Sequence, residues 1–176
     1  MPPSDGKDGS NMKTKRDIIR IPLFSELKEP DNYDVYVYGS DQLEEKQQDT
    51  FTKALNRYLD YYGINVRELS LLSGLSKSGI YYYFSGKRHV TYDSLCAVCI
   101  ALRLHPMRQK HLFCKSHLMM PADDPYPSTR DIILRSFLSA CAFEEEYIVI
   151  ACNDSLIEKG CKPISALTSA KEERTE

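Results

Sequence analysis

Apolar residues recur three and four positions apart over most of the chain from Phe51 to Leu156, which is the spacing of one buried face of an α-helix. Turn residues interrupt this pattern and divide it into segments. Seven helices are predicted in this way, over approximately residues 41–62, 66–73, 76–85, 91–102, 107–119, 128–141 and 144–159. The sequence therefore predicts a mainly α fold.

Glycines and short polar side chains mark where several of these helices begin and end. Gly63 and Gly74 each follow the last residue of a helical pattern, and glycine readily adopts the left-handed conformation that ends a helix. Asn65 precedes Glu68 by three residues, which is the spacing of a capping box. Ser76 is placed to cap the helix that follows. We therefore expect a helix, a tight turn at Gly74 and a second helix.

The composition along the chain divides it into two helical parts with an arm, a linker and a tail. The arm is rich in Pro, Gly, Ser and charged residues at its start, and is predicted to be disordered or extended, with a candidate strand at Tyr33–Tyr38. Three prolines mark the linker. The boundaries are 1–42 for the arm, 43–120 for the first helical part, 121–127 for the linker, 128–167 for a C-terminal helical pair and 168–176 for a frayed tail.

The C-terminal helical pair is too small to bury a core of its own. We expect it to dock on the first helical part or to pair with its copy in a second chain.

The stretch Asn65–Arg88 has the pattern of a helix-turn-helix, in which the second helix lies in the major groove of DNA. Its first helix carries Leu69 and Leu72 on one face, and its second helix carries Ile80 and Phe84 four residues apart. The early side chains of the second helix are polar. This arrangement predicts that the second helix is buried on one face and exposes polar groups on the other.

Phe51–Leu104 resembles the lambda-repressor-like (Cro/C1-type, XRE) helix-turn-helix family, most closely over the turn and helix GLSKSGIYYYFSG, residues 74–86. The resemblance implies a five-helix DNA-binding domain in which the start of the third helix reads base edges. The base-reading positions would be Ser76, Lys77, Ser78, Tyr81 and Tyr82. The positions that contact DNA phosphates would be Asn65, Arg67, Ser85, Lys87 and Arg88.

The chain departs from the family pattern at three places. Val66 stands where a glutamine is frequent, which removes a side-chain contact to phosphate, and Val90 stands near a frequent proline. Three consecutive tyrosines are unusual. We expect Tyr83 to pack inward or against a partner, which leaves Tyr81 and Tyr82 outside.

Charge is distributed unevenly along the chain. The whole chain carries 23 Lys and Arg against 25 Asp and Glu, a net charge of −2. Residues 51–120 hold ten Lys and Arg but three acids, a net of +7, whereas the remainder holds 13 basic and 22 acidic residues, a net of −9. A basic middle part is typical of a module that binds a polyanion. An uneven surface without function is the alternative.

The six cysteines are expected to be reduced thiols, because no secretory signal precedes them. Core packing is the default role of those inside apolar helical runs, which are Cys96, Cys99, Cys114, Cys141 and Cys152. Cys96 and Cys99 with Cys114 and His117 have a spacing that resembles a zinc site. Both pairs, however, fall within predicted helices rather than in knuckles, so we expect no metal and no other cofactor. A thiol redox sensor is a further alternative.

These patterns together predict a sequence-specific, DNA-binding transcriptional regulator, with double-stranded DNA as its partner and a homodimer as its state. No catalytic residues are recognisable, and neither an enzyme nor a small-molecule substrate is expected. No apolar run is long enough to span a membrane, and we expect a cytoplasmic protein. The alternative is a protein-interaction module, antitoxin-like or an anti-repressor, that keeps the helix-turn-helix scaffold.

Overall fold

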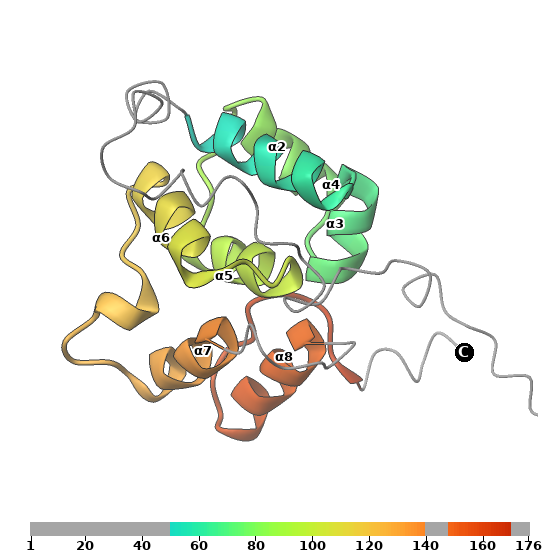
Figure 1. The fold of residues 1–176 in the computed structure, drawn as a ribbon. Helices are drawn as coiled ribbons and strands as arrows, with labels where there is room; N and C mark the ends of the chain where they lie inside the picture. Colours follow the sequence, from blue (N-terminus) through green and yellow to red (C-terminus); the bar gives the residue numbers. More distant parts are fainter. Residues whose placement is uncertain (1–49, 140–147, 170–176) are drawn as a thin grey trace, which may run out of the picture.

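The computed structural model describes residues 50–139 and 148–169, and within them every regular element is helical, which confirms the mainly α fold (Figure 1). The elements are α2 (Phe51–Tyr62), α3 (Val66–Ser73), α4 (Lys77–Phe84), α5 (Tyr92–Ala101), α6 (Pro106–Lys115), a 3₁₀ helix (Pro121–Asp123), α7 (Thr129–Ser139) and α8 (Ile148–Glu158). The predicted arm, its candidate strand Tyr33–Tyr38 and the acidic run Glu144–Glu146 lie outside the described residues.

The helix starts in the first half of the molecule follow from capping side chains. Thr50 accepts a hydrogen bond from the Lys53 amide, so α2 begins at Phe51 and the predicted start at Asp41 is wrong. Asn65 and Glu68 form the complete predicted capping box at the start of α3. These bonds pair amides that have no partner inside the helix.

Helix α5 lies in the middle of the fold, and α3, α6, α7 and α8 all pack against it (Figure 1). The helical spacing of Leu95, Val98, Cys99 and Leu102 predicts one buried stripe on this helix. Instead, every residue from Ser94 to Ala101 is buried, as are Leu102 and Leu104 directly after it. The prediction fails because it treats only the first helical part, whereas α7 and α8 cover the face that would otherwise be exposed. A helix that is apolar all round is typical of the centre of a core.

In two helices, the left-handed residue that follows the helix and ends it is not a glycine. Helix α6 ends at Lys115 rather than at Met119, because His117 adopts a left-handed conformation (φ 56°). The Leu118 amide then donates back to the Phe113 carbonyl at 3.0 Å. Arg103 (φ 47°) ends α5 in the same way. Both ends have the hydrogen-bonding pattern usually built around glycine, so neither end could be placed from the residue types alone.

The proline-rich segment 121–127 is held against the helices. It contains the short 3₁₀ helix, and Pro121 is buried. Arg135 on α7 donates hydrogen bonds to the carbonyls of Pro121 and Asp124. A guanidinium that spans two carbonyls fixes both of them in orientation. The segment is therefore part of the packed structure rather than a free connection.

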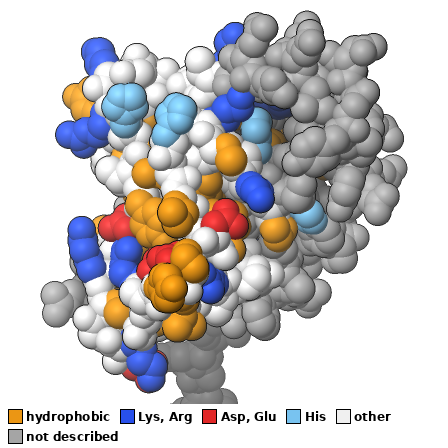
Figure 2. All heavy atoms as spheres, turned by 90° about the vertical axis from the view of Figure 1, so that its left-hand side faces the viewer, with side chains coloured by type: hydrophobic (Ala, Val, Ile, Leu, Met, Phe, Trp, Pro, Cys, Tyr) orange, Lys and Arg blue, Asp and Glu red, His pale blue; other side chains and the backbone are white. Residues whose placement is uncertain are grey.

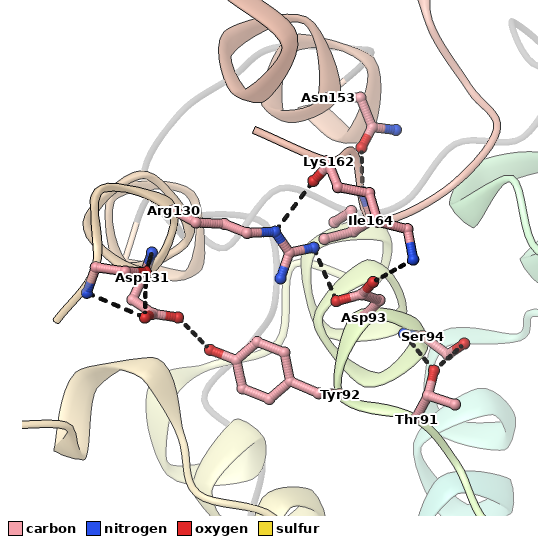
Figure 3. A network of polar contacts seen from close by, with 10 residues as sticks. Thr91, Tyr92, Asp93, Ser94, Arg130, Asp131, Asn153, Lys162 and Ile164 are labelled. Carbon is pink, nitrogen blue, oxygen red and sulfur yellow. Dashed lines mark hydrogen bonds and ion pairs between the residues drawn. The ribbon is translucent and has the colours of Figure 1, made fainter. Parts of the chain in front are cut away.

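The C-terminal pair α7 and α8 docks on α5 through a polar network at the N-terminal end of α5 (Figure 3). Arg130 on α7 forms an ion pair with Asp93 at 2.8 Å and donates to the Lys162 carbonyl at 3.0 Å. The Tyr92 hydroxyl donates to Asp131 at 2.8 Å. Two residues of α5 are thus joined to two residues of α7 by charge-assisted hydrogen bonds.

Candidate nucleic-acid interface

The turn between α3 and α4 is fixed by side chains from α3. Gly74 has a left-handed conformation (φ 72°), and its amide donates to the Ser70 carbonyl at 3.0 Å. The Ser70 hydroxyl donates to the Leu75 carbonyl at 2.6 Å, and the Leu75 amide donates to Ser73 Oγ at 3.3 Å. Because these backbone groups of the turn are hydrogen-bonded to residues of α3, the direction of α4 relative to α3 is fixed.

One face of α4 is anchored in the protein. Ile80 is completely buried and Tyr83 is 8% exposed, as predicted for the inward tyrosine. The Tyr83 hydroxyl is hydrogen-bonded to Ser94 Oγ on α5 at 2.9 Å. Its carbonyl accepts from the Thr52 hydroxyl on α2 at 3.2 Å. Contacts with two other helices, α5 and α2, thus fix the rotation of α4 about its axis.

The opposite face of α4 carries four of the five predicted base-reading residues. Lys77 and Ser78 are exposed in the first turn, and Tyr81 and Tyr82 lie one turn later, 58% and 44% exposed. Positions separated by four residues lie one above the other on a helix. The structure therefore brings together a cation, a hydroxyl and two phenols on one exposed surface, as the sequence predicts.

Ser76, the fifth of these residues, also has a structural role. Its Oγ accepts from the Gly79 amide at 3.1 Å, so it caps α4. Ser85 is engaged at the other end, where its hydroxyl donates to the Tyr82 carbonyl at 3.3 Å. Ser76 is exposed, and its Oγ also lies 3.4 Å from Ser78 Oγ. The two serines define the ends of the helix, and Ser76 is also placed at the edge of the surface that Lys77 begins.

The predicted phosphate contact at the start of α3 is altered by the capping box. The Glu68 carboxylate accepts from the Asn65 amide at 2.8 Å, and Asn65 Oδ1 accepts from the Glu68 amide at 3.0 Å. A carboxylate therefore already occupies the position where a phosphate would meet the positive end of the helix dipole. A contact from Asn65 would use its side-chain Nδ2, and Arg67 beside it is exposed.

The loop after α4 presents two cations. Lys87 and Arg88 are exposed, and the chain reaches them through Gly86, which is left-handed (φ 69°). The Arg88 amide donates back to the Tyr82 carbonyl at 3.2 Å, which fixes the start of the loop against α4. The two cations therefore lie at a defined position beside the exposed face of α4, where a phosphate backbone could be contacted.

Part of the positive charge counted in residues 51–120 is unavailable to a polyanion. Arg103 and Arg108 are 9% and 7% exposed. The Arg108 guanidinium lies 4.4 Å from the centre of the Tyr61 ring, a cation–π contact between α6 and α2. Two of the ten cations are thus structural, and the sequence count overestimates the charge that a ligand would meet.

Sequence reasoning missed the residues that hold the turn in place from the far end of the chain. A Cβ added to Gly74 would lie 2.5 Å from Leu167 Cγ and 2.8 Å from Ser165 Oγ, so both side chains pack against this glycine. Nothing in the local pattern of the segment 161–169 indicates this contact. Ser70 and Ser73, by contrast, lie in the motif itself, and their spacing before Gly74 could have suggested their role.

The cysteines whose spacing resembles a zinc site differ in their exposure to solvent. Cys96 and Cys99 are completely buried on α5, whereas Cys114 is exposed on α6. Burial raises the pKa of the Cys96 thiol, and it raises the pKa of Cys152 to about 12. Over residues 50–139 and 148–169, no cluster of three or more His, Cys, Asp and Glu side chains is placed to hold a metal ion.

The face formed by α6, the proline-rich segment and α7 exposes other kinds of side chain than α4 does (Figure 2). Hydrophobic side chains gather in its middle, with acidic and basic groups around them. Met119, Tyr126 and Ile132 are 63%, 90% and 55% exposed along this part of the chain. Mixed charge around apolar groups does not suit a phosphate backbone, which distinguishes this face from the surface of α4.

Within the described residues, none of the helices combines the length and the apolar character that crossing a bilayer demands. No family model matches the chain, and none of the curated proteins or solved structures is significantly similar to it.

Proposed function

We propose that this chain is a sequence-specific DNA-binding transcriptional regulator that reads the major groove with α4. One observation carries the proposal. Lys77, Ser78, Tyr81 and Tyr82 share the exposed face of a short helix whose other face is anchored through Ile80. A helix that is fixed in rotation and exposes hydrogen-bonding groups in its first turns is suited to reading base edges.

The chemistry of each exposed group supports a role at DNA. The Lys77 ammonium can donate to O6 or N7 of guanine, and the Ser78 hydroxyl can donate or accept. The rings of Tyr81 and Tyr82 can pack on a thymine methyl group or reach a phosphate through their hydroxyls. Lys87 and Arg88 add the sequence-independent attraction to the backbone. The resemblance to the lambda-repressor-like family supports the same assignment, with a homodimer bound to a palindromic site.

Selection of bound sequences from a random pool of duplex DNA tests the proposal directly. The full chain is expected to enrich one sequence class and to bind it with an affinity that falls as salt rises. The Lys77→Ala variant should lose about 1–3 kcal/mol of discrimination at one base pair. Lys87→Ala should weaken all sequences alike and reduce the salt slope by about one. Lys159→Ala, an exposed lysine beyond α8, is the matched control and should change neither.

The Glu68 carboxylate at the start of α3 favours a second candidate, a protein-interaction module of the antitoxin-like or anti-repressor kind. Its negative charge would repel a phosphate that approached this helix end. Under the DNA proposal, Glu68→Gln keeps the side-chain acceptor and should raise affinity for all duplexes. Under the alternative, no duplex binds at any salt concentration, and a partner protein is captured from nuclease-treated extract.

A further inference from the structure

The C-terminal segment 161–169 returns from α8 to the turn of the helix-turn-helix. In Figure 1 it runs from the end of α8 toward α3. Leu167 and Ser165 pack against Gly74, and Thr168 beside them is 9% exposed. Ile164, at the start of the contact, is 4% exposed. Residues almost a hundred positions away in the sequence therefore cover the turn that sets the direction of α4.

A single buried side chain on α8 holds this segment in place. Asn153 is completely buried, and its Oδ1 accepts from the Ile164 amide at 2.9 Å (Figure 3). Its Nδ2 donates to the Ser165 hydroxyl at 3.0 Å and to the Leu167 carbonyl at 2.7 Å. Both ends of one amide group are thus used to fix the residues that touch Gly74. A buried amide with these partners is costly to replace by an apolar group, because backbone groups would lose their partners.

The same segment is also tied to α7 and to the start of α5. The Lys162 carbonyl accepts from Arg130, and the Lys162 ammonium lies 3.7 Å from Asp93 (Figure 3). Asp93 lies in the first turn of α5, one residue before Ser94, which is bonded to Tyr83 of α4. The segment therefore contacts the turn before α4 directly, and it contacts α5 one residue away from the hydrogen-bond partner of Tyr83.

We propose that Asn153 is a positioning residue for α4, the helix proposed to read DNA. Asn153 acts through the segment 161–169, which serves as a brace on the α3–α4 turn. The brace holds Gly74 and the start of α4 in one orientation without touching the reading surface itself. Its effect on DNA rests on the proposed function, whereas its effect on the turn does not. Loss of the brace should loosen the start of α4 more than the rest of the core.

Hydrogen exchange of the full chain tests the brace without DNA. Asn153→Leu is expected to speed exchange of the amides from Gly74 to Ile80 by about tenfold relative to the rest of α2–α5. Leu112→Ala, in the buried face of α6, is the control for general destabilisation and should speed exchange across the core without this local excess. A uniform change in Asn153→Leu, matching that of the control, would overturn the proposal.

A second variant guards against a failure of Asn153→Leu to fold. Leu167→Ala removes the side chain nearest Gly74 and leaves the amide of Asn153 in place. It should reproduce the local increase in exchange, and exchange unchanged at residues 74–80 would also overturn the proposal.

DNA binding gives the second readout. Both variants should lower affinity for the selected sequence by about tenfold while affinity for random duplex stays within about twofold, because the cations of the loop after α4 are untouched. Equal losses for both kinds of DNA would argue against a positioning role. If the unaltered chain binds no duplex, the proposed function fails, and the exchange experiment still decides whether the brace exists.

Discussion

The helix ends of the first half and the docking of the C-terminal half rely on polar contacts of different reach. In α2–α5 the capping bonds join residues three apart, as between Asn65 and Glu68 or between Ser76 and Gly79. In the C-terminal half, Arg130 binds Asp93 across 37 positions, and Asn153 binds the Leu167 carbonyl across 14. The first kind can form in a short peptide, whereas the second kind forms only when the tertiary structure is complete.

This difference in reach indicates how far each half of the molecule depends on the other for its structure. The helix-turn-helix has its helix ends specified locally, and it needs the remainder of the chain chiefly to cover α5 and the turn at Gly74. The helices α7 and α8 depend on long-range partners for their positions. Variants that remove one kind of contact at a time can therefore test whether the two halves are as separate as these distances indicate.

The largest effect is expected from Gly74→Ala, compared with Gly86→Ala. Both glycines are left-handed, and an alanine in that conformation costs about 1 kcal/mol. A Cβ at Gly86 meets nothing within 4 Å, whereas one at Gly74 meets Leu167. We expect losses in the free energy of unfolding of about 1 kcal/mol at Gly86 and about 2–4 kcal/mol at Gly74, measured by denaturant titration. Equal losses would show that the C-terminal segment yields freely.

Arg130→Met should have the next largest effect, because it removes the ion pair with Asp93 and the bond to the Lys162 carbonyl. The expected loss of stability is about 1–3 kcal/mol, since both bonds are charge-assisted and the ion pair with Asp93 is partly shielded from water. Arg67→Met, at an exposed arginine of α3, is the matched control and should stay within about 0.5 kcal/mol. Thermal unfolding distinguishes the two. If Arg130→Met lost no more stability than Arg67→Met, the polar network would not contribute to the docking of the C-terminal helices.

Asn65→Ala tests the local side of the comparison. The loss of the cap on α3 should cost about 1 kcal/mol and speed hydrogen exchange within α3. Asn56→Ala, at an exposed position inside α2, should cost nothing measurable because alanine favours a helix interior. If the rate of hydrogen exchange in α7 and α8 rose together with that in α3, loss of the capping box would destabilise the whole fold and not α3 alone.

The smallest effect is expected from pH acting on Asp131. Desolvation alone would raise the pKa of this carboxyl, but hydrogen bonds from Ser128 and Tyr92 outweigh it, and the pKa lies below the ordinary 3.8. The folded state therefore binds the proton less readily than the unfolded state. Its contribution to stability is complete above pH 3.8 and is lost as pH falls through the folded value.

Urea titrations at pH 5 and at lower pH measure this contribution. Asp131→Asn should reduce the acid sensitivity of the chain, because asparagine does not titrate. An unchanged slope of stability against pH in this variant would assign acid sensitivity to other carboxyls.

Sequence alone could predict the features of the fold that have local causes. The helix ends at Gly63 and Gly74 and the caps at Asn65 and Ser76 were predicted, because each depends on side chains within three or four residues. The ends of α5 and α6 could not be placed in the same way, since Arg103 and His117 take a conformation that glycine normally marks. The start of α2 was predicted too early, because the polar residues before Thr50 fit a helix as well as they fit an arm.

The candidate site shows the same division. The exposed face of α4 followed from its helical period, with Tyr83 correctly placed inward. The contact of Leu167 with Gly74 had no local signal, because residues so distant in sequence meet only through the fold. The burial of α5 on all sides did have a signal. The run from Leu95 to Leu102 is almost entirely apolar, which one covered face would not require.

The burial of α5 on every side also constrains how this chain can be inherited and recombined. Helices α3 and α6 cover part of its surface, and α7 and α8 cover the rest. A recombination event that exchanged only the C-terminal helices for poorly matching ones would leave an apolar stripe of α5 open to water, which favours aggregation. Helix α5 and the helices that cover it therefore have to be inherited together. Diversification without loss of the fold is confined to exposed positions, among them the surface of α4.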